Sequence, residues 1–269
     1  MAHTKTALIT GSTDGLGREV ARRLALAGFT TLIHGRDRAR GESLVGEIRS
    51  AGGTAQFYQA DFASLADVRA LAGVVMDDYP RLDILINNAG IGTGGRGLVR
   101  ECSVDGYELR FAVNYLAGFL LTHLLIPCLL KTPESRLVNV ASAGQYPLDF
   151  DNLMLTRAYS GMRAYAQSKL AQVMFTFDLA NELHAAGLTA NCLHPASLMN
   201  TTMVRQSGMK PASTVAEGTE AVLHVALAAL AGSGPYFDGV QPARAHAQAY
   251  DDAARARLRA VSRELTGLD

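Results

Sequence analysis

Short apolar segments rich in β-branched residues alternate with longer segments of helical periodicity along most of the chain. Parallel strands need a crossover of about a dozen residues or more between them, and that crossover is usually a helix. The alternation therefore predicts βαβ units around one parallel sheet, with helices on both faces. The segments expected to form strands are residues 6–10, 30–34, 55–60, 83–87, 136–141 and 188–194, with a short strand near Tyr236.

The segments between these strands have the spacing of apolar residues expected of helices. They cover residues 15–27, 38–50, 64–79, 104–130, 159–186 and 214–231, and an Ala/Arg-rich tail over residues 243–263 is expected to form a solvated terminal helix. No repeat or Pro/Ser-rich linker divides the 269 residues. The sequence thus predicts an α/β fold in a single domain, residues 1–269, with a doubly wound parallel sheet of about seven strands.

Charge and cysteine content exclude several classes of protein. Lys plus Arg and Asp plus Glu both number 25, so no net field attracts nucleic acid. Cys102, Cys128 and Cys192 form no CxxC pair, which is typical of neither a disulfide framework nor a zinc site, and we expect no metal. The N-terminal run MAHTKTALIT becomes strand-like too early to hold a signal peptide. We therefore expect a cytoplasmic protein.

The longest apolar stretch, residues 115–130, is interrupted by Thr122, His123 and Pro127. It falls short of the roughly 20 apolar residues that a membrane span needs. We expect it to form a buried helix and expect no membrane span.

A glycine-rich turn follows the first strand and leads directly into a helix, in the sequence Gly11-Ser12-Thr13-Asp14-Gly15-Leu16-Gly17. Such glycines let the backbone turn tightly and let a pyrophosphate approach, and the helix N-terminus attracts the phosphates. The spacing is GxxxGxG and not the GxGxxG of the usual dinucleotide fingerprint. By itself, a plain strand-to-helix turn would explain it as well as a Rossmann-type cofactor site.

Two further motifs follow strands or lie on helices. Asn88-Ala89-Gly90 follows the fourth strand, where small residues would let a flat ring or a ribose pack against the backbone. Tyr165 and Lys169 are spaced i, i+4 and so share one helix face. A nearby ammonium favours the phenolate, which brings the tyrosine pKa closer to neutral pH, as proton transfer requires. A surface pair is the alternative for this spacing alone.

Together, TGSTDGLG at position 10, NNAG at 87 and YAQSK at 165 resemble the signature motifs of the short-chain dehydrogenase/reductase family, and the resemblance covers essentially the whole chain. It implies a single-domain Rossmann-type fold and hydride transfer between a nicotinamide and an alcohol or carbonyl carbon. Tyr165 would transfer the proton, Lys169 would lower the pKa of Tyr165 and bind the nicotinamide ribose, and Ser142 would position the substrate oxygen. Asn114 would support a proton relay, with a polar contact between helices as the alternative.

The interval between Ser142 and Tyr165 is longer than in most members of that family. The added segment, residues 145–159, is expected to form a loop over the active site. This segment, SKLAQVMFTFDLANEL and GPYFDG resemble the retinol dehydrogenase-like branch of the family, which acts on lipophilic alcohols and carbonyls. The resemblance does not identify the substrate.

Two readings of the cofactor compete at the end of the second strand, His34-Gly35-Arg36-Asp37. An acidic residue there would bind the ribose 2′-hydroxyl of NAD, and an arginine would accommodate the 2′-phosphate of NADP. Arg36 comes first and Asp37 is better placed to cap the next helix, so NADP(H) is preferred and NAD(H) remains possible. The resemblance implies adenine contacts from Asp61 and Phe62.

His194-Pro195-Ala196 follows the sixth strand, where the family has a segment that contacts the nicotinamide carboxamide. The threonine comes later than usual, at Thr201, and we interpret His194 as structural. Residues 203–211 are expected to form a lid. The cofactor contacts implied in total are Gly11, Ser12, Asp14, Gly15, Leu16, Gly17, Arg36, Asp61, Phe62, Asn88, Ala89, Gly90, Tyr165, Lys169, Pro195 and Thr201.

The sequence thus predicts an oxidoreductase that acts on a small-molecule carbonyl or alcohol. One alternative is a non-redox member of the same superfamily, such as an epimerase, dehydratase or cyclase. Another is a binding protein that senses the cofactor. A homodimer or homotetramer is possible through the long helix over residues 104–130, although burial within one subunit explains its apolar character equally well.

Overall fold

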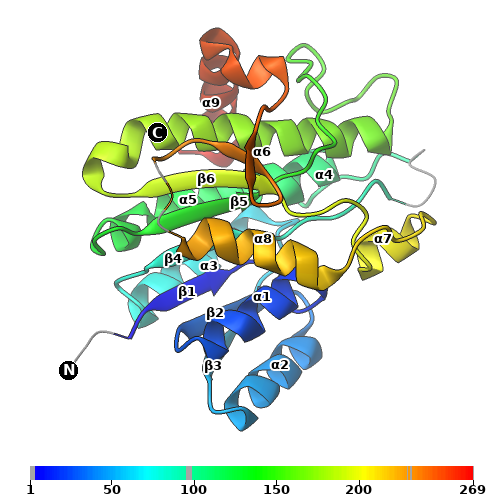
Figure 1. Ribbon diagram of the computed structural model, residues 1–269. Coiled ribbons are helices and arrows are strands. Elements are labelled where there is room, and N and C mark those ends of the chain that lie inside the picture. Colours follow the sequence, from blue (N-terminus) through cyan, green and yellow to red (C-terminus); the bar gives the residue numbers. More distant parts are fainter. Residues whose placement is uncertain (1–3, 95–98, 229, 231, 269) are drawn as a thin grey trace.

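One eight-stranded sheet forms the centre of the computed structural model, which describes residues 4–94, 99–228, 230 and 232–268. Its order is β3-β2-β1-β4-β5-β6-β7-β8, and every neighbouring pair is parallel except β7 and β8. The chain starts in the middle of the sheet, winds outward to β3, and returns to wind outward on the other side (Figure 1). The strands are β1 (Thr6–Ile9), β2 (Thr30–Gly35), β3 (Thr54–Gln59), β4 (Ile84–Asn87), β5 (Arg136–Val140), β6 (Thr189–His194), β7 (Tyr236–Asp238) and β8 (Gln241–Ala243).

The predicted doubly wound fold is confirmed, but the sheet has eight strands where the sequence predicted about seven. The added strand, β8, is an exposed antiparallel edge of three residues that contains Pro242. A strand without a buried face has no alternation of apolar residues, so it leaves no periodic signal.

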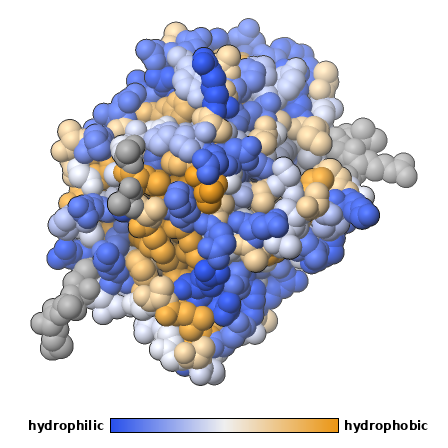
Figure 2. Space-filling model, viewed as in Figure 1, coloured by the Kyte–Doolittle hydropathy of each residue, from blue (hydrophilic) through white to orange (hydrophobic). Residues whose placement is uncertain are grey.

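Helices cover both faces of the sheet, and the buried apolar residues accordingly divide into two clusters. The first face carries α1 (Gly15–Leu26), α2 (Arg38–Ser50) and α8 (Val215–Leu227). Figure 2 shows this side, where hydrophilic residues cover most of the surface and apolar residues gather where α1 and α8 lie side by side. The other face carries α3 (Leu65–Asp78), α4 (Leu109–Phe111), the π-helical turn η1 (Ala112–Leu116), α5 (Ala117–Leu129), α6 (Gly161–Leu183) and α9 (Asp252–Thr266). Short helical segments are η2 (His184–Ala186), α7 (Thr202–Gln206) and η3 (Ala247–Tyr250).

Several helix boundaries differ from the prediction. The helix expected over residues 104–130 begins only at Leu109, because residues 102 and 108 form an isolated β-bridge, and η1 interrupts it. The helix expected from residue 159 begins at Gly161, since Ser160 caps its N-terminus by accepting a hydrogen bond from the Arg163 amide. The glycine-rich sequence GIGTGGRG over residues 90–97 is typical of a mobile loop, and of these residues 95–97 lie outside the described residues.

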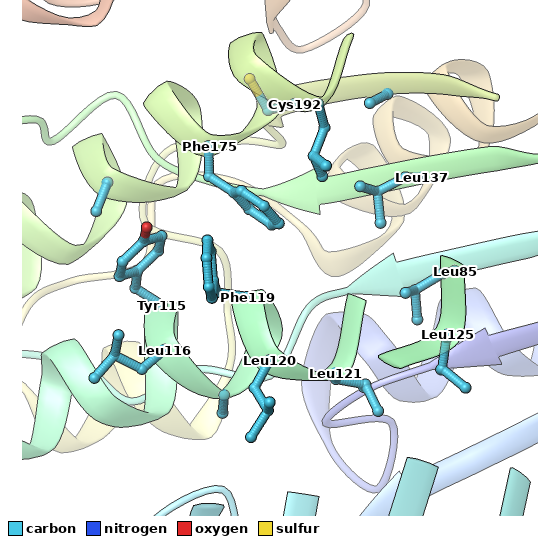
Figure 3. Packing of buried hydrophobic residues seen from close by; sticks show 14 of the residues in the cluster. Leu85, Tyr115, Leu116, Phe119, Leu120, Leu121, Leu125, Leu137, Phe175 and Cys192 are labelled. Carbon is cyan, nitrogen blue, oxygen red and sulfur yellow. The ribbon is translucent and has the colours of Figure 1, made fainter. Parts of the chain in front are cut away.

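Aromatic side chains pack η1 and α5 against α6 (Figure 3). The ring centroids of Phe119 and Phe175 are 4.9 Å apart, and those of Tyr115 and Phe175 are 6.3 Å apart. Aromatic pairs at these distances contribute beyond the area that they bury. This packing fixes the position of η1 relative to α6, and the candidate catalytic residues lie on these two elements.

The helical stretch Leu109–Leu129 is long and apolar enough to span a membrane by length and composition, the one such stretch found among the described residues. Most of it is buried inside the protein, as in the core helix of a globular protein. Burial within one subunit therefore accounts for its apolar character.

Helix α9 is less solvated than its composition suggested. Its buried residues include Leu258 and Ser262. The Ser262 and Tyr115 hydroxyls are hydrogen-bonded at 2.7 Å. Arg255 pairs with Asp178 of α6 at 2.8 Å. The terminal helix thus covers the outer side of η1 and α6.

Candidate active site

The motifs identified in the sequence meet at one edge of the sheet. Parallel neighbours end together, as the register of β1 with β4, β4 with β5, and β5 with β6 shows. The glycine turn follows β1, Asn88 follows β4, Ser142 follows β5 and Pro195 follows β6. In open α/β sheets this carboxyl edge is where ligands bind.

Close contacts explain the glycines of the turn. Gly11 and Gly15 have φ angles of +62° and +51°, which favour glycine. A Cβ atom at Gly17 would lie 2.4 Å from Asn88 Nδ2 and 2.5 Å from the Gly11 carbonyl oxygen, so no side chain fits there. The turn is therefore packed tightly against the segment after β4.

Asn88 and Ala89 hold the glycine turn in place. Asn88 Nδ2 donates to the carbonyl oxygens of Thr10 and Gly11 at 2.9 and 3.1 Å. The amides of Asn88 and Ala89 both donate to Thr10 Oγ1 at 3.0 Å. NNAG is thus a brace between β1 and β4, and not a free polar turn.

Ser12 and Asp14 serve the turn itself. The buried Ser12 hydroxyl donates to the Ile9 carbonyl at 2.7 Å and accepts from the His34 amide at 3.0 Å. Asp14 caps α1, since its carboxylate accepts from the Gly15 amide at 2.7 Å. Leu16 is buried in the first turn of α1. Direct cofactor contacts from these residues stay predictions.

His34 is a structural residue of this site that the sequence did not reveal. Its Nδ1 accepts from the Gly11 amide at 3.1 Å, so Nε2 carries the proton and donates to the Ala60 carbonyl at 3.2 Å. The ring stacks on Phe62 at 4.2 Å between centroids. Burial lowers the pKa of His34 to about 4, which keeps the ring neutral at pH 7. The signal was available in the sequence as a polar residue ending a buried strand.

An open cavity of about 490 Å³ lies between the glycine turn and the start of α2. Arg40 lines it together with Thr13, Asp14, Arg18 and Ser43. Arg40 Nη1 is 3.4 Å from Asp14 Oδ2, and the Arg40 guanidinium remains mostly exposed. Arg40 was not singled out from the sequence, because only the fold brings the first turn of α2 beside the glycine turn.

The two residues that follow β2 have different roles: Asp37 caps a helix, whereas the Arg36 side chain is exposed. Asp37 caps α2 by accepting from the Arg40 amide at 3.0 Å, as the sequence indicated. Arg36 is exposed and lies 4.0 Å from Asp61, whose carboxylate also accepts from the Ala63 amide. Phe62 is buried beneath His34.

Ser142, Tyr165 and Lys169 lie together at the end of β5. The Ser142 side chain lies close enough to the Tyr165 hydroxyl to lower the tyrosine pKa, and the Lys169 ammonium is 5.8 Å from the centroid of the Tyr165 ring. The Ser142 carbonyl accepts from Gln145 Nε2 at 2.9 Å and from the Tyr236 hydroxyl at 3.2 Å. The serine backbone is therefore fixed from two sides.

Burial shifts both titratable groups of this trio away from their charged forms. It raises the pKa of Tyr165, and the contact with Ser142 opposes that rise. It lowers the pKa of Lys169 to about 7. Charged forms are costly in surroundings from which water is removed. The tyrosine is therefore held in its neutral form, which can donate a proton.

Asn114 lies in the π-helical turn η1 and clamps the segment after β4. Its Oδ1 accepts from the Ile91 amide at 2.8 Å, and its Nδ2 donates to the Ile91 carbonyl at 3.1 Å and to Ser168 Oγ at 2.9 Å. The side chain thus makes the contact between helices that was its alternative reading, and a relay function stays a prediction. π-Helical turns occur frequently at functional sites.

Gly90 lies between Asn114 and Lys169. A Cβ atom there would be 3.3 Å from Asn114 Oδ1 and 3.6 Å from Lys169 Nζ. The absence of a side chain at this position keeps the space beside the Lys169 ammonium open.

The segment after β6 leads into the short helix α7. His194 Nε2 is hydrogen-bonded to Ser197 Oγ at 3.0 Å, which fits the structural interpretation, and Pro195 is buried beside it. Thr201 caps α7, and its methyl group would be 3.1 Å from a Cβ atom at Gly15. The predicted lid segment therefore begins next to the glycine turn.

The added segment between Ser142 and α6 is anchored along its length. Gln167 Nε2 donates to the Leu153 carbonyl at 2.7 Å, and Arg100 Nε donates to the Met154 carbonyl at 2.8 Å. Tyr159, at its end, donates to Glu108 Oε1 at 3.1 Å. This is an ordered wall of the site.

A buried ion cluster joins that wall to the segment after β4. Arg110, which is almost fully buried, pairs with Glu101 at 2.9 Å and with the buried Glu108 at 3.5 Å. Its Nε donates to the Gly92 carbonyl at 3.2 Å, and its Nη1 donates to the Tyr159 hydroxyl at 3.0 Å. One guanidinium therefore holds three segments that border the site.

The sequence profile of the short chain dehydrogenase family matches residues 5–212. Two human proteins are similar over 98% of this chain. Dehydrogenase/reductase SDR family member 13 is 36% identical, with 74% of its length covered. Retinol dehydrogenase 13 is 34% identical, with 85% of its length covered.

Solved structures show the same architecture. An uncharacterised protein from Mycobacterium paratuberculosis has a TM-score of 0.81 at 33% identity, covering 98% of this chain and 93% of that one. Actinorhodin polyketide ketoreductase with NADPH has a TM-score of 0.71 at 25% identity, with coverages of 88% and 97%. The 3-ketoacyl-(acyl-carrier-protein) reductase from Brucella melitensis, complexed with NADH, has a TM-score of 0.70 at 28% identity, with coverages of 87% and 96%.

Proposed function

The chain belongs to the short-chain dehydrogenase/reductase family, whose members here include alcohol and carbonyl oxidoreductases, and we propose that it interconverts an alcohol and a ketone or aldehyde with NADP(H). The observation that carries this proposal is the meeting of Ser142, Tyr165 and Lys169 at the sheet edge. The glycine turn ends at the same edge.

The residues present fit a dinucleotide. The positions of Gly11 and Gly17 leave no room for side chains, and the glycine turn brings backbone amides to the N-terminus of α1, where phosphates bind favourably. Gly90 leaves space beside Lys169 for a ribose. When bound, the nicotinamide supplies or accepts the hydride.

NADP(H) is preferred over NAD(H) because of two arginines. Asp37 is engaged in capping α2, so it is a poor partner for a ribose 2′-hydroxyl. Arg36 and Arg40 are both exposed, and Arg40 lines the open cavity beside the glycine turn. Guanidinium groups bind phosphates with strong, charge-assisted hydrogen bonds.

In the reduction direction, the Tyr165 hydroxyl donates its proton to the substrate oxygen, and the Ser142 hydroxyl donates a hydrogen bond to that same oxygen. Lys169 offsets the negative charge left on the Tyr165 oxygen. In oxidation, the tyrosinate accepts the proton from the alcohol. The raised pKa of Tyr165 means that the neutral proton donor is its resting form.

A lipophilic substrate fits the side chains that flank the site. Tyr146, Met162, Leu198 and Met203 are large, partly exposed residues on the segments next to Ser142, Tyr165, Pro195 and Gly92. Exposed apolar groups of this kind bind apolar ligands by removing both surfaces from water. The name of Retinol dehydrogenase 13 agrees with such a substrate class, without identifying retinol as the substrate.

The experiment is to supply purified protein with NADPH or NADH and a panel of lipophilic ketones and aldehydes, following the absorbance of the reduced nicotinamide. Turnover with NADPH supports the proposal. Tight cofactor binding with no turnover on any substrate class would support a cofactor-sensing protein instead, and product formation without net change in the cofactor would support a non-redox enzyme.

We also propose that the protein acts in the cytoplasm. Any homodimer or homotetramer should form through a surface other than the outer side of α6, because α9 covers that side. Light scattering of the full chain and of a variant with charged residues on an exposed helix would measure the assembly.

A further inference from the structure

Two neutral oxygen atoms hold the Lys169 ammonium. Lys169 Nζ donates to the Val140 carbonyl at 2.8 Å and to the side-chain oxygen of Gln172 at 2.9 Å. Lys169 is 5% exposed and Gln172 is 3% exposed. Within the part of the chain that the structure describes, no carboxylate forms an ion pair or hydrogen bond with this ammonium. A buried cation with so little compensation depends strongly on each hydrogen bond that it makes.

Gln172 lies on the same face of α6 as the catalytic pair. Tyr165, Lys169, Gln172 and Thr176 follow one another at intervals of four, three and four residues, which keeps them on the side of α6 that faces the sheet. Thr176 Oγ1 donates to the Gln172 carbonyl at 2.7 Å and accepts from Asn139 Nδ2 at 2.9 Å. The backbone of Gln172 is thus tied to β5 independently of its side chain.

The Val140 carbonyl belongs to β5 and cannot be changed without moving the strand. The side-chain oxygen of Gln172, in contrast, depends on the residue type at this position, and an apolar residue of similar size could take its place. Hydrogen bonds to charged groups are stronger than those between neutral groups, and burial lowers the pKa of Lys169 to about 7. At that value, a lost hydrogen bond would leave most of the lysine uncharged at neutral pH.

We propose that Gln172 is a positioning residue, whose side-chain oxygen keeps the Lys169 ammonium charged and directed to the space beside Gly90. Its effect on turnover rests on the proposed oxidoreductase function. Its effect on Lys169 does not, because the contact joins two side chains of the protein itself.

Other titratable groups near Lys169 belong to different contacts. Tyr165 precedes it by one helical turn, and His194 of β6 has its pKa lowered mainly by burial, with Asp238 raising it and Lys169 lowering it further. Cys192 of β6 contacts Thr176, and burial raises the pKa of its thiol to about 12. The charged groups on the remaining neighbours of α6 pair elsewhere: Arg110 with Glu101 and Glu108, and Arg255 and Arg259 with Asp178.

The test is a pH titration of the full chain labelled with ¹³C at lysine Cε, followed by NMR. Lys5, Lys131 and Lys210 are the other lysines, and a Lys169→Met sample assigns the remaining signal. In Gln172→Met, which preserves volume, we expect the apparent pKa of Lys169 to fall by about one pH unit. In Gln172→Glu, which retains the oxygen and adds a charge, we expect it to rise above the wild-type value.

Thr176→Val is the matched control. It disturbs the same face of α6 and removes the hydrogen bonds to Gln172 and Asn139, but it leaves the contact with Lys169 in place. The variant should lose stability and keep the pKa of Lys169. The proposal is overturned if Gln172→Met and Gln172→Glu leave that pKa where it is in the wild type, or if both move it in the same direction.

Turnover gives a second readout. In alcohol oxidation, the high-pH limb of kcat/KM should report loss of the Lys169 charge, so it should move to lower pH in Gln172→Met and to higher pH in Gln172→Glu. If Gln172 had only a structural role, the variants would lower kcat/KM without shifting the pH at which its high-pH limb falls. A wild type that turns over no substrate overturns the proposed function, whereas the NMR titration would still decide the role of Gln172.

Discussion

The Tyr159 hydroxyl accepts a hydrogen bond from Arg110 at 3.0 Å, although Tyr159 ends the segment that follows Ser142 and Arg110 belongs to α4. Through this contact, the wall formed by residues 145–159 is joined to the segment after β4. Both segments border the place where the substrate is expected.

Tyr159→Phe should therefore loosen the wall. Two partly buried hydrogen bonds are lost, so we expect a loss of about 1–3 kcal/mol in unfolding free energy and a several-fold rise in KM for the carbonyl substrate, with kcat little changed. Denaturant unfolding and steady-state kinetics measure the two effects. Tyr79→Phe is the control. The Tyr79 hydroxyl also donates one hydrogen bond, to Gln56, but Tyr79 follows α3 and does not belong to the wall over residues 145–159. A KM equal to that of the wild type would contradict the expectation.

Tyr165→Phe should abolish turnover and leave NADPH binding intact. The ring remains, while the proton donor is removed, and positioned proton transfer contributes about 10²–10⁴-fold to rate. Ser142→Ala should reduce kcat by less, since it removes a hydrogen bond and not the proton. NADPH fluorescence measures binding, and nicotinamide absorbance measures turnover. A fully active Tyr165→Phe enzyme would remove this tyrosine from the mechanism.

Arg36→Asp and Arg40→Ala should each raise KM for NADPH by about tenfold and change KM for NADH far less. Each variant removes a charge-assisted hydrogen bond to the 2′-phosphate of NADPH, and NADH has no such phosphate. Arg38→Ala provides the comparison, because Arg38 is as exposed as Arg36 and is likewise paired, with Glu42, but does not line the cavity beside the glycine turn. Equal effects on both cofactors would argue against NADP(H) specificity.

Gly17→Ala should damage the cofactor site, and Gly46→Ala should not. A Cβ atom at Gly17 would lie within 2.5 Å of neighbouring atoms, whereas nothing lies within 4 Å of one at Gly46 in the middle of α2. We expect the first variant to lose most of its NADPH affinity and the second to gain about 0.5–1 kcal/mol from better helix propensity. Calorimetric binding and thermal unfolding measure the pair. Unaltered NADPH affinity in Gly17→Ala would show that the turn does not contact the cofactor.

Lys169→Met should stabilise the free protein near pH 7 while removing activity. Burial lowers the folded pKa of Lys169 to about 7, below its ordinary value of 10.5, so the unfolded chain binds more protons between these values. Wild-type stability should consequently increase as pH rises from about 7 to 10.5, and Lys169→Met should flatten that increase. A gain of about 2 kcal/mol at pH 7 is expected, partly offset by the unpaired oxygens of Val140 and Gln172. Urea unfolding of both proteins across this pH range is the measurement. If burial did not lower the pKa of Lys169, the unfolding free energies of the wild type and of Lys169→Met would change in parallel with pH.

Periodicity predicted most of the fold because buried strands and amphipathic helices must repeat their apolar residues. It could not predict β8, which buries nothing, or η1, whose extra residue per turn has no periodic signature over a single turn. The motif residues Ser142, Tyr165 and Lys169 were found because their spacing is local or their position at a strand end is visible.

Residues that act across the fold were harder to find. Arg40 and Gln172 are ordinary helix residues in the sequence, and only packing places one beside the glycine turn and the other beside Lys169. His34 supports Gly11 through a contact between two strands. Such residues can be identified only once the packing of strands and helices is known, because the groups that they contact come from other segments of the chain.

The docking of α9 on η1 has a consequence for how the protein is made. The Tyr115 hydroxyl, next to Asn114 in the chain, finds its partner on Ser262, and the Tyr107 hydroxyl donates to the Leu265 carbonyl. These partners are synthesised after the last strand of the sheet and well after the catalytic helix α6, which ends at Leu183. The pocket therefore gains these supports only after its catalytic residues have been synthesised, and nascent chains that stop before residue 252 would carry every catalytic side chain on an unfinished frame.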